Sequence, residues 1–101
     1  MKGVLIAWTL PDVDKTRTST LSKGLYGQET SSHGGKYIYW RKGLLDDIPY
    51  VKLIRGVVIV KEKDSKRVVE FLKGYDAKVH VREVTLSRRD ERTLSTRKLP
   101  S

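Results

Sequence analysis

Residues Val51 to Val60 read VKLIRGVVIV, a run rich in branched apolar residues in a chain of 101 residues. Valine and isoleucine favour strands, and a nearly continuous apolar run is typical of a strand that is buried on both faces. Gly56 interrupts the run, which indicates either a bulge or a close approach by another element. The stretch predicts a central strand of a sheet.

The residues that follow predict a helix. Asp64 is a suitable N-cap, and Gly74 stands where a left-handed C-terminal cap would end the helix. Four apolar residues between them share one helical face at spacings of i, i+3, i+4 and i+7: Val68, Phe71, Leu72 and Tyr75. We expect this stripe to be buried against the sheet.

A last strand is expected over Lys78 to Leu86 (KVHVREVTL), whose mixed faces suit an edge position. The alternation slips near Arg82-Glu83, which indicates a bulge. Residues 87–101 are polar and basic, with five cations and two acids. We expect a short helix over 87–94, or disorder, in this C-terminal tail.

On the N-terminal side, Gly3 to Leu10 (GVLIAWTL) predicts another buried strand. Residues 12–27 predict a helix that ends at Gly24 or Gly27, because they offer a cap and an apolar face. The helix is expected to be weak, because the segment is rich in Ser and Thr, which are poor helix formers. The cap would be Asp12 or Asp14, and the face would hold Val13, Leu21 and Leu25. Residues 28–36 are expected to form a mobile basic loop, Tyr37 to Lys42 a strand, and Leu44 to Ile48 a helical turn.

The predicted order is strand, helix, strand, strand, helix, strand over a single domain, residues 1–86. This is the βαββαβ pattern of a ferredoxin-like α+β sandwich, with a four-stranded antiparallel sheet and two helices on one face. Tyr37–Lys42 and Lys78–Leu86 would be its edge strands. The strand order is similar to that of the RNA-recognition motif. Neither Gly3–Leu10 nor Val51–Val60 carries the aromatic signature of that family, so the resemblance assigns no binding residues.

Composition narrows the possible partners. The net charge is +9, which favours polyanionic partners, and cysteine is absent, which excludes disulfides and thiolate chemistry. His33 and His80 have no ligand-like spacing, so we expect neither a metal nor a cofactor. No apolar run reaches the ~20 residues that span a bilayer, and the N-terminus lacks a signal-peptide pattern, so we expect a cytoplasmic protein without a membrane partner. Asparagine is absent and Gln28 is the single glutamine, which is typical of a protein from a hot environment.

A contact surface for nucleic acid, with RNA favoured, is expected around the predicted strand Tyr37–Lys42. Residues 15–42 hold six cations and one acid, Glu29. If Ile38 and Trp40 face the helices, the two neighbouring tyrosines point outward on the open sheet face, where bases stack on aromatic rings and cations hold phosphates. The candidate binding residues are Arg17, Lys23, His33, Lys36, Tyr37, Tyr39, Arg41, Lys42 and Arg55.

Other interpretations of the same residues remain open. A metal-independent ribonuclease would use His33 and Lys36 with Tyr37 or Tyr39 as acid, base and charge-stabilising groups. The tyrosines are equally consistent with ordinary edge-strand packing. A structural module that forms a homodimer, or that joins a ribonucleoprotein, is a third interpretation. Gly34-Gly35 favours a hairpin-like entry to the strand over an anion-binding loop.

Overall fold

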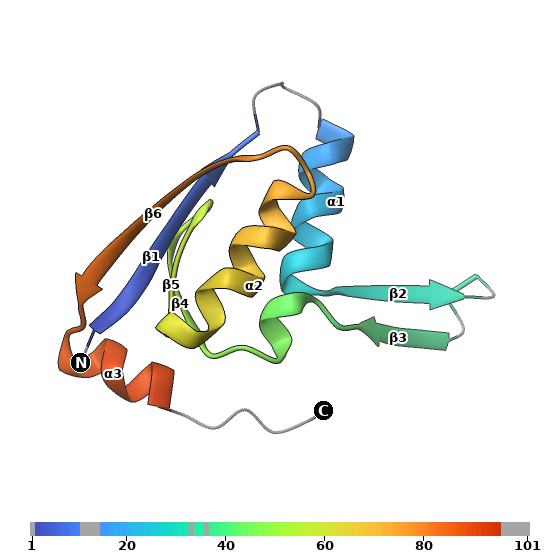
Figure 1. Ribbon diagram of the computed structural model, residues 1–101. Coiled ribbons are helices and arrows are strands. Elements are labelled where there is room, and N and C mark those ends of the chain that lie inside the picture. The colour runs from blue at the N-terminus through green and yellow to red at the C-terminus, as the bar shows by residue number, and fades with distance from the viewer. Residues whose placement is uncertain (1, 11–14, 33, 36, 96–101) are drawn as a thin grey trace.

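A computed structural model describes residues 2–10, 15–32, 34–35 and 37–95. The fold is α+β, with three α-helices, a four-stranded antiparallel sheet in the order β4-β5-β1-β6 and a separate two-stranded ribbon, β2-β3 (Figure 1). The elements are β1 (Lys2–Thr9), α1 (Lys15–Tyr26), β2 (Gln28–Ser32), β3 (Tyr37–Arg41), the 3₁₀ turn η1 (Leu44–Asp46), β4 (Tyr50–Ile54), β5 (Val57–Val60), α2 (Glu62–Lys73), β6 (Lys78–Thr85) and α3 (Arg88–Ser95).

The main core lies between one face of the sheet and the helices α1 and α2. Alternate residues of the two central strands point to this face, and both helices place an apolar stripe against it. The predicted stripe of α2 is confirmed, since Val68 and Leu72 are fully buried and Phe71 and Tyr75 pack against the same core. The buried side chains of this core are Val4, Ile6, Leu21, Leu25, Leu45, Ile48, Val58, Val60, Val68 and Leu72.

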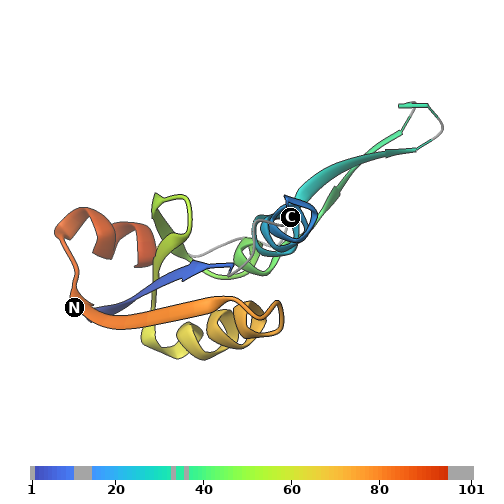
Figure 2. The ribbon, with the colours of Figure 1, turned by 90° about the horizontal axis from the view of Figure 1, so that it is seen from above.

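The opposite face of the sheet is partly covered by α3. Figure 2 shows α3 and α2 on opposite sides of β1. Leu94 of α3 is fully buried and forms a second, smaller core with Ile59 and Leu86. The short helix expected after residue 87 is therefore present. The expectation that this face of the sheet lies open is wrong in part, because the apolar side of α3 packs against it.

The run Val51–Val60 is two strands and not one. Arg55 and Gly56 form a turn between β4 and β5, and Gly56 has a φ of 88°, which lets the chain reverse. The backbone N–H of Trp8 donates to the carbonyl oxygen of Gly56 at 2.9 Å, so the close approach expected at Gly56 is real. Both arms are apolar, and apolar content alone does not distinguish one long strand from a tight hairpin.

The prediction that Tyr37–Lys42 forms an edge strand of the main sheet is wrong. Residues Tyr37–Arg41 pair with Gln28–Ser32 in the ribbon, so the expected loop over 28–36 is largely a strand. Gly34 and Gly35, at φ values of 67° and 87°, reverse the chain between them. The edge position in the main sheet belongs instead to β4.

Several local predictions also change. α2 begins at Glu62 after Lys61, although Asp64 was expected to be its N-cap. Gly74 has a right-handed conformation, and the positive φ, 59°, is found at Asp76 instead.

The register of β1 with β6 is unbroken, so the bulge expected near Arg82-Glu83 is absent. The irregularity lies in β4, between Lys52 and Ile54. The weak helix is present as α1 and ends before Gly27, while Asp12, Val13 and Asp14 lie outside the described residues.

Candidate nucleic-acid interface

The ribbon β2-β3 projects from the body of the protein, as Figures 1 and 2 both show. Four consecutive large side chains on β3 are exposed: Tyr37 at 48%, Ile38 at 65%, Tyr39 at 54% and Trp40 at 56%. Exposed aromatic residues in such a series are unusual for a protein surface and typical of a binding site. The tyrosines are thus exposed as expected, but Ile38 and Trp40 do not face the helices.

The two faces of the ribbon differ in charge. Strand periodicity and the β2-β3 register place Tyr37, Tyr39 and Arg41 on one face, opposite Thr30 and Gln28. We call this the tyrosine face. The rings of Tyr37 and Tyr39 lie 6.5 Å apart between centroids at 27°, in a stacked arrangement. The other face carries Ile38 and Trp40 opposite Ser31 and Glu29, so the acid of the ribbon lies away from Arg41.

A shallow pocket of about 420 Å³ lies where the ribbon meets α1. It contains three cations from two parts of the chain, Lys23 of α1 and the consecutive residues Arg41 and Lys42. No acidic side chain is among the described residues that line it. We call this pocket the basal cleft. Arg41 belongs to both the basal cleft and the tyrosine face, so positive charge continues from the two rings to α1. The remaining lining residues are Thr20, Gly24, Gln28 and Tyr75.

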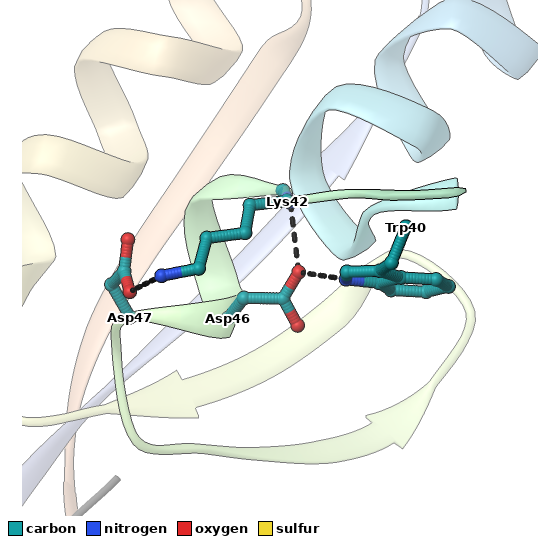
Figure 3. Close-up of polar contacts among 5 residues, drawn as sticks. Trp40, Lys42, Asp46 and Asp47 are labelled. Atoms are coloured by element: carbon teal, nitrogen blue, oxygen red, sulfur yellow. Dashed lines mark hydrogen bonds and ion pairs between the residues drawn. The ribbon is translucent and has the colours of Figure 1, made fainter. Parts of the chain in front are cut away.

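The base of the ribbon is anchored by Asp46, as Figure 3 shows. Its carboxylate accepts hydrogen bonds from Trp40 Nε1 at 3.0 Å and from the Gly43 backbone N–H at 2.9 Å. The next residue, Asp47, forms an ion pair with Lys42 at 3.2 Å. The Asp46 carboxylate thus joins the end of β3 to η1.

We expect Asp46→Ala to lower the free energy of unfolding by about 1–2 kcal/mol, because it removes the acceptor of two hydrogen bonds. Asp47→Ala is the matched control, because its ion pair with Lys42 is exposed and contributes only about 0–0.5 kcal/mol. Urea unfolding followed by far-UV circular dichroism measures both variants. Equal midpoints for the two would show that Asp46 does not anchor the ribbon.

The remaining predicted residues lie in other places. Arg17 forms an ion pair with Asp76 at 2.7 Å. Arg55 lies at the turn between β4 and β5 and lines a different pocket, so the expectation that it joins the tyrosines is not met. His33 and Lys36 lie outside the described residues, so the ribonuclease interpretation and any anion binding by that loop stay predictions.

Sequence reasoning missed the partner strand of the ribbon and the exposure of Trp40. Gly34-Gly35 before Tyr37 is a turn signal, but Gln28–Ser32 (QETSS) is polar throughout and carries no strand periodicity. The contribution of Gln28 and Thr20 to the basal cleft has no signal in the sequence. It depends on how the ribbon leaves the end of α1.

Two tyrosines of the body have raised pKa values. Burial, and to a lesser extent the neighbouring Tyr50, raise the pKa of Tyr26 above its ordinary value. Burial and then Asp46 raise the pKa of Tyr50 in the same direction. Both phenols are therefore protonated, and able to donate a hydrogen bond, at neutral pH.

Comparison with protein-family models, with curated proteins and with solved structures finds no match to this chain. Within the described ranges, no three His, Asp or Glu side chains gather in a way that could hold a metal ion. In that same part of the chain, no helix is long and apolar enough to cross a bilayer.

Proposed function

We propose that this protein binds nucleic acid, with single-stranded RNA favoured, through the tyrosine face of the ribbon and the basal cleft. The observation that carries the proposal is the stacked, exposed pair Tyr37 and Tyr39 on the same ribbon face as Arg41. Unpaired bases stack on such rings, and a neighbouring cationic groove holds the phosphates. A projecting ribbon offers its rings to a strand without steric hindrance from the body.

Charge supports the proposal independently of the rings. The chain carries a net charge of +9, and three cations converge in the basal cleft, in reach of a strand whose bases lie on the tyrosine face. Glu29 on the other face of the ribbon would repel phosphates. The distribution therefore favours one face of the ribbon over the other for a polyanion.

We further propose that the main sheet with α1 and α2 is a ferredoxin-like unit into which the ribbon is inserted between α1 and β4. Without the ribbon and α3, the order of elements is β1, α1, β4, β5, α2, β6, with β1 and β5 central. Both helices contribute to the core on one face of this sheet. In this arrangement the binding residues belong to the insertion and not to the sheet, unlike those of the RNA-recognition motif.

The test is the salt dependence of binding to labelled oligouridine, measured by fluorescence anisotropy. Three phosphate contacts on a single strand predict a slope of log K against log salt of about −2, and Arg41→Gln should reduce its magnitude by about 0.7. Arg67→Gln, which removes the same charge from the exposed side of α2, should leave the slope almost unchanged. Parallel titrations with oligodeoxythymidine and duplex RNA measure the preference for RNA and for single strands.

Two results would contradict the proposal. One is binding that does not depend on salt, and the other is an equal effect of Arg41→Gln and Arg67→Gln. If sedimentation instead shows a mass that rises with protein concentration, and no oligonucleotide binds, the exposed rings belong to an interface between copies of this chain.

A further inference from the structure

A second pocket, of about 300 Å³, lies among the end of β1, one side of α1 and the turn between β4 and β5. Its volume is at the lower end of the range for small-ligand sites. The lining residues come from three separate parts of the chain and include one indole, one guanidinium and several hydroxyl groups. They are Trp8, Thr9, Leu10, Thr18, Leu21, Ser22, Tyr26, Arg55 and Gly56.

Three hydroxyl-bearing residues on the same side of α1 line this pocket. Thr18, Ser22 and Tyr26 are spaced four residues apart, which places them on one side of the helix. Among the described residues, none of the three hydroxyls has a hydrogen-bond partner, and the phenol oxygen of Tyr26 is also buried. Thr18 and Ser22 are only partly buried, so their hydroxyls are the ones that a ligand in the pocket can reach.

Arg55 supplies a cation on another side of the same pocket. The guanidinium is exposed, and it has no acidic partner among the described residues. Its turn is held against β1 by the hydrogen bond from Trp8 N–H to Gly56 at 2.9 Å. Lys52 adds positive charge nearby, because its Nζ lies 4.7 Å from the centroid of the Tyr26 ring. The pocket therefore combines an exposed cation on a held turn with hydroxyl donors, a combination that suits an oxyanion with several acceptor oxygens.

The pocket lining also includes aromatic and apolar side chains. Trp8 lines it together with Leu10 and Leu21. An indole offers a flat surface for a planar ring, and the aliphatic side chains exclude water from it. A ligand that uses both kinds of lining carries a phosphate and an aromatic ring.

We infer that this pocket binds a nucleoside monophosphate, with its phosphate on Arg55 and the α1 hydroxyls and its base against Trp8. The nucleotide is either free or the 5′-terminal unit of a strand. The inference goes beyond the proposed function, because no residue of the ribbon lines the pocket. An experiment can therefore contradict nucleotide binding in this pocket without contradicting nucleic-acid binding at the ribbon, and the reverse.

The two tryptophans of the chain, Trp8 and Trp40, make the test direct, since one lines the pocket and the other lies on the ribbon. Their indole N–H signals are followed in ¹⁵N-correlated NMR spectra during titration with uridine monophosphate and adenosine monophosphate. We expect a saturable shift of the Trp8 signal with a Kd of about 1 mM or tighter, and little change at Trp40. A Trp8 signal that does not move with either nucleotide at about 10 mM overturns the inference.

The contributions of phosphate and base are separated by two further ligands and two variants. Arg55→Gln should weaken nucleotide binding by at least about tenfold, and Arg67→Gln should not change it. Uridine and inorganic phosphate should each bind much more weakly than the nucleotide. Equal affinity for uridine would remove the role of Arg55, and equal affinity for inorganic phosphate would remove the role of Trp8; either result overturns the assignment.

The source of the nucleotide is distinguished by comparing 5′-phosphorylated and 5′-hydroxyl oligouridine. A Trp8 shift with the phosphorylated strand alone supports the 5′ end of a strand as the ligand. A Trp8 shift with the free nucleotide and with neither strand supports a free mononucleotide. Movement of Trp40 with both strands reports binding at the ribbon and does not depend on the pocket.

Discussion

Replacing Tyr39 with alanine should weaken binding of oligouridine by roughly 5- to 150-fold, the effect of losing about 1–3 kcal/mol of stacking on one base. The ring is 54% exposed and stacks on Tyr37, so its removal also leaves the second ring without its neighbour. Tyr39→Phe keeps the aromatic surface and should retain most of the affinity. Anisotropy titrations at one fixed salt concentration measure all three proteins.

Ile38→Ala is the matched control for Tyr39→Ala. It removes a large, strand-favouring side chain from the adjacent position of the same strand, but on the opposite face of the ribbon. If the tyrosine face binds the strand, Ile38→Ala should change the affinity less than about twofold, which is well below the effect of one stacked base. Equal losses for Ile38→Ala and Tyr39→Ala would mean that alanine acts by weakening the ribbon, and the tyrosine face would not be the site.

The second large effect is expected at Gly43, where the chain leaves the ribbon and passes over the end of α1. A Cβ added there would collide with the backbone nitrogen of Gly27 and come within 2.6 Å of the carbonyl carbon and oxygen of Leu25. The backbone of Gly43 is extended, with φ −96° and ψ 171°, so alanine has no torsional penalty. The whole cost of Gly43→Ala comes from separating two backbone segments.

We expect Gly43→Ala to lower the free energy of unfolding by about 3 kcal/mol or more, because backbone atoms cannot move aside as side chains do. For a chain of this length the loss corresponds to a fall in Tm of about 12 °C or more, measured by calorimetry. The fully buried side chains of Leu25 and Leu45 flank this contact, so its disruption reaches the core.

Gly35→Ala is the comparison for Gly43→Ala. Gly35 has a positive φ of 87° but no atom within 4 Å of an added Cβ. Its substitution costs about 1–2 kcal/mol of local strain at the tip of the ribbon. We therefore expect a fall in Tm of about 4–8 °C, smaller than the fall expected for Gly43→Ala. Similar Tm values for Gly43→Ala and the unsubstituted protein would show that the ribbon base tolerates separation from α1.

The local periodicity of the chain predicted several elements correctly. The stripe Val68, Phe71, Leu72 and Tyr75 predicted α2, and the branched run Gly3–Leu10 predicted the central strand β1. These elements depend on side chains within one or two turns or along one strand, and such spacings are visible in a single sequence. The exact ends were less accurate, as the start of α2 at Glu62 shows.

Only part of the predicted residue set lies together in the candidate site: Lys23, Tyr37, Tyr39, Arg41 and Lys42. Tyr37, Tyr39 and Arg41 share a face, as period two requires, whichever strand pairs with them. Lys23 and Lys42 join them because the ribbon begins directly after α1. Arg55 does not, since a turn at Gly56 places it with Trp8 and Ser22 instead.

The sequence by itself determined the buried stripe of α2 and which segments carry the positive charge, because both follow from neighbours along the chain. Only the tertiary structure decided that Gln28–Ser32 pairs with Tyr37–Arg41 outside the main sheet, and that Val51–Val60 reverses at Gly56. Backbone hydrogen bonds between strands are nearly independent of side-chain identity. The choice among possible partners therefore depends on how the whole chain packs. For the main sheet that choice buries apolar side chains, whereas the ribbon leaves those of β3 exposed.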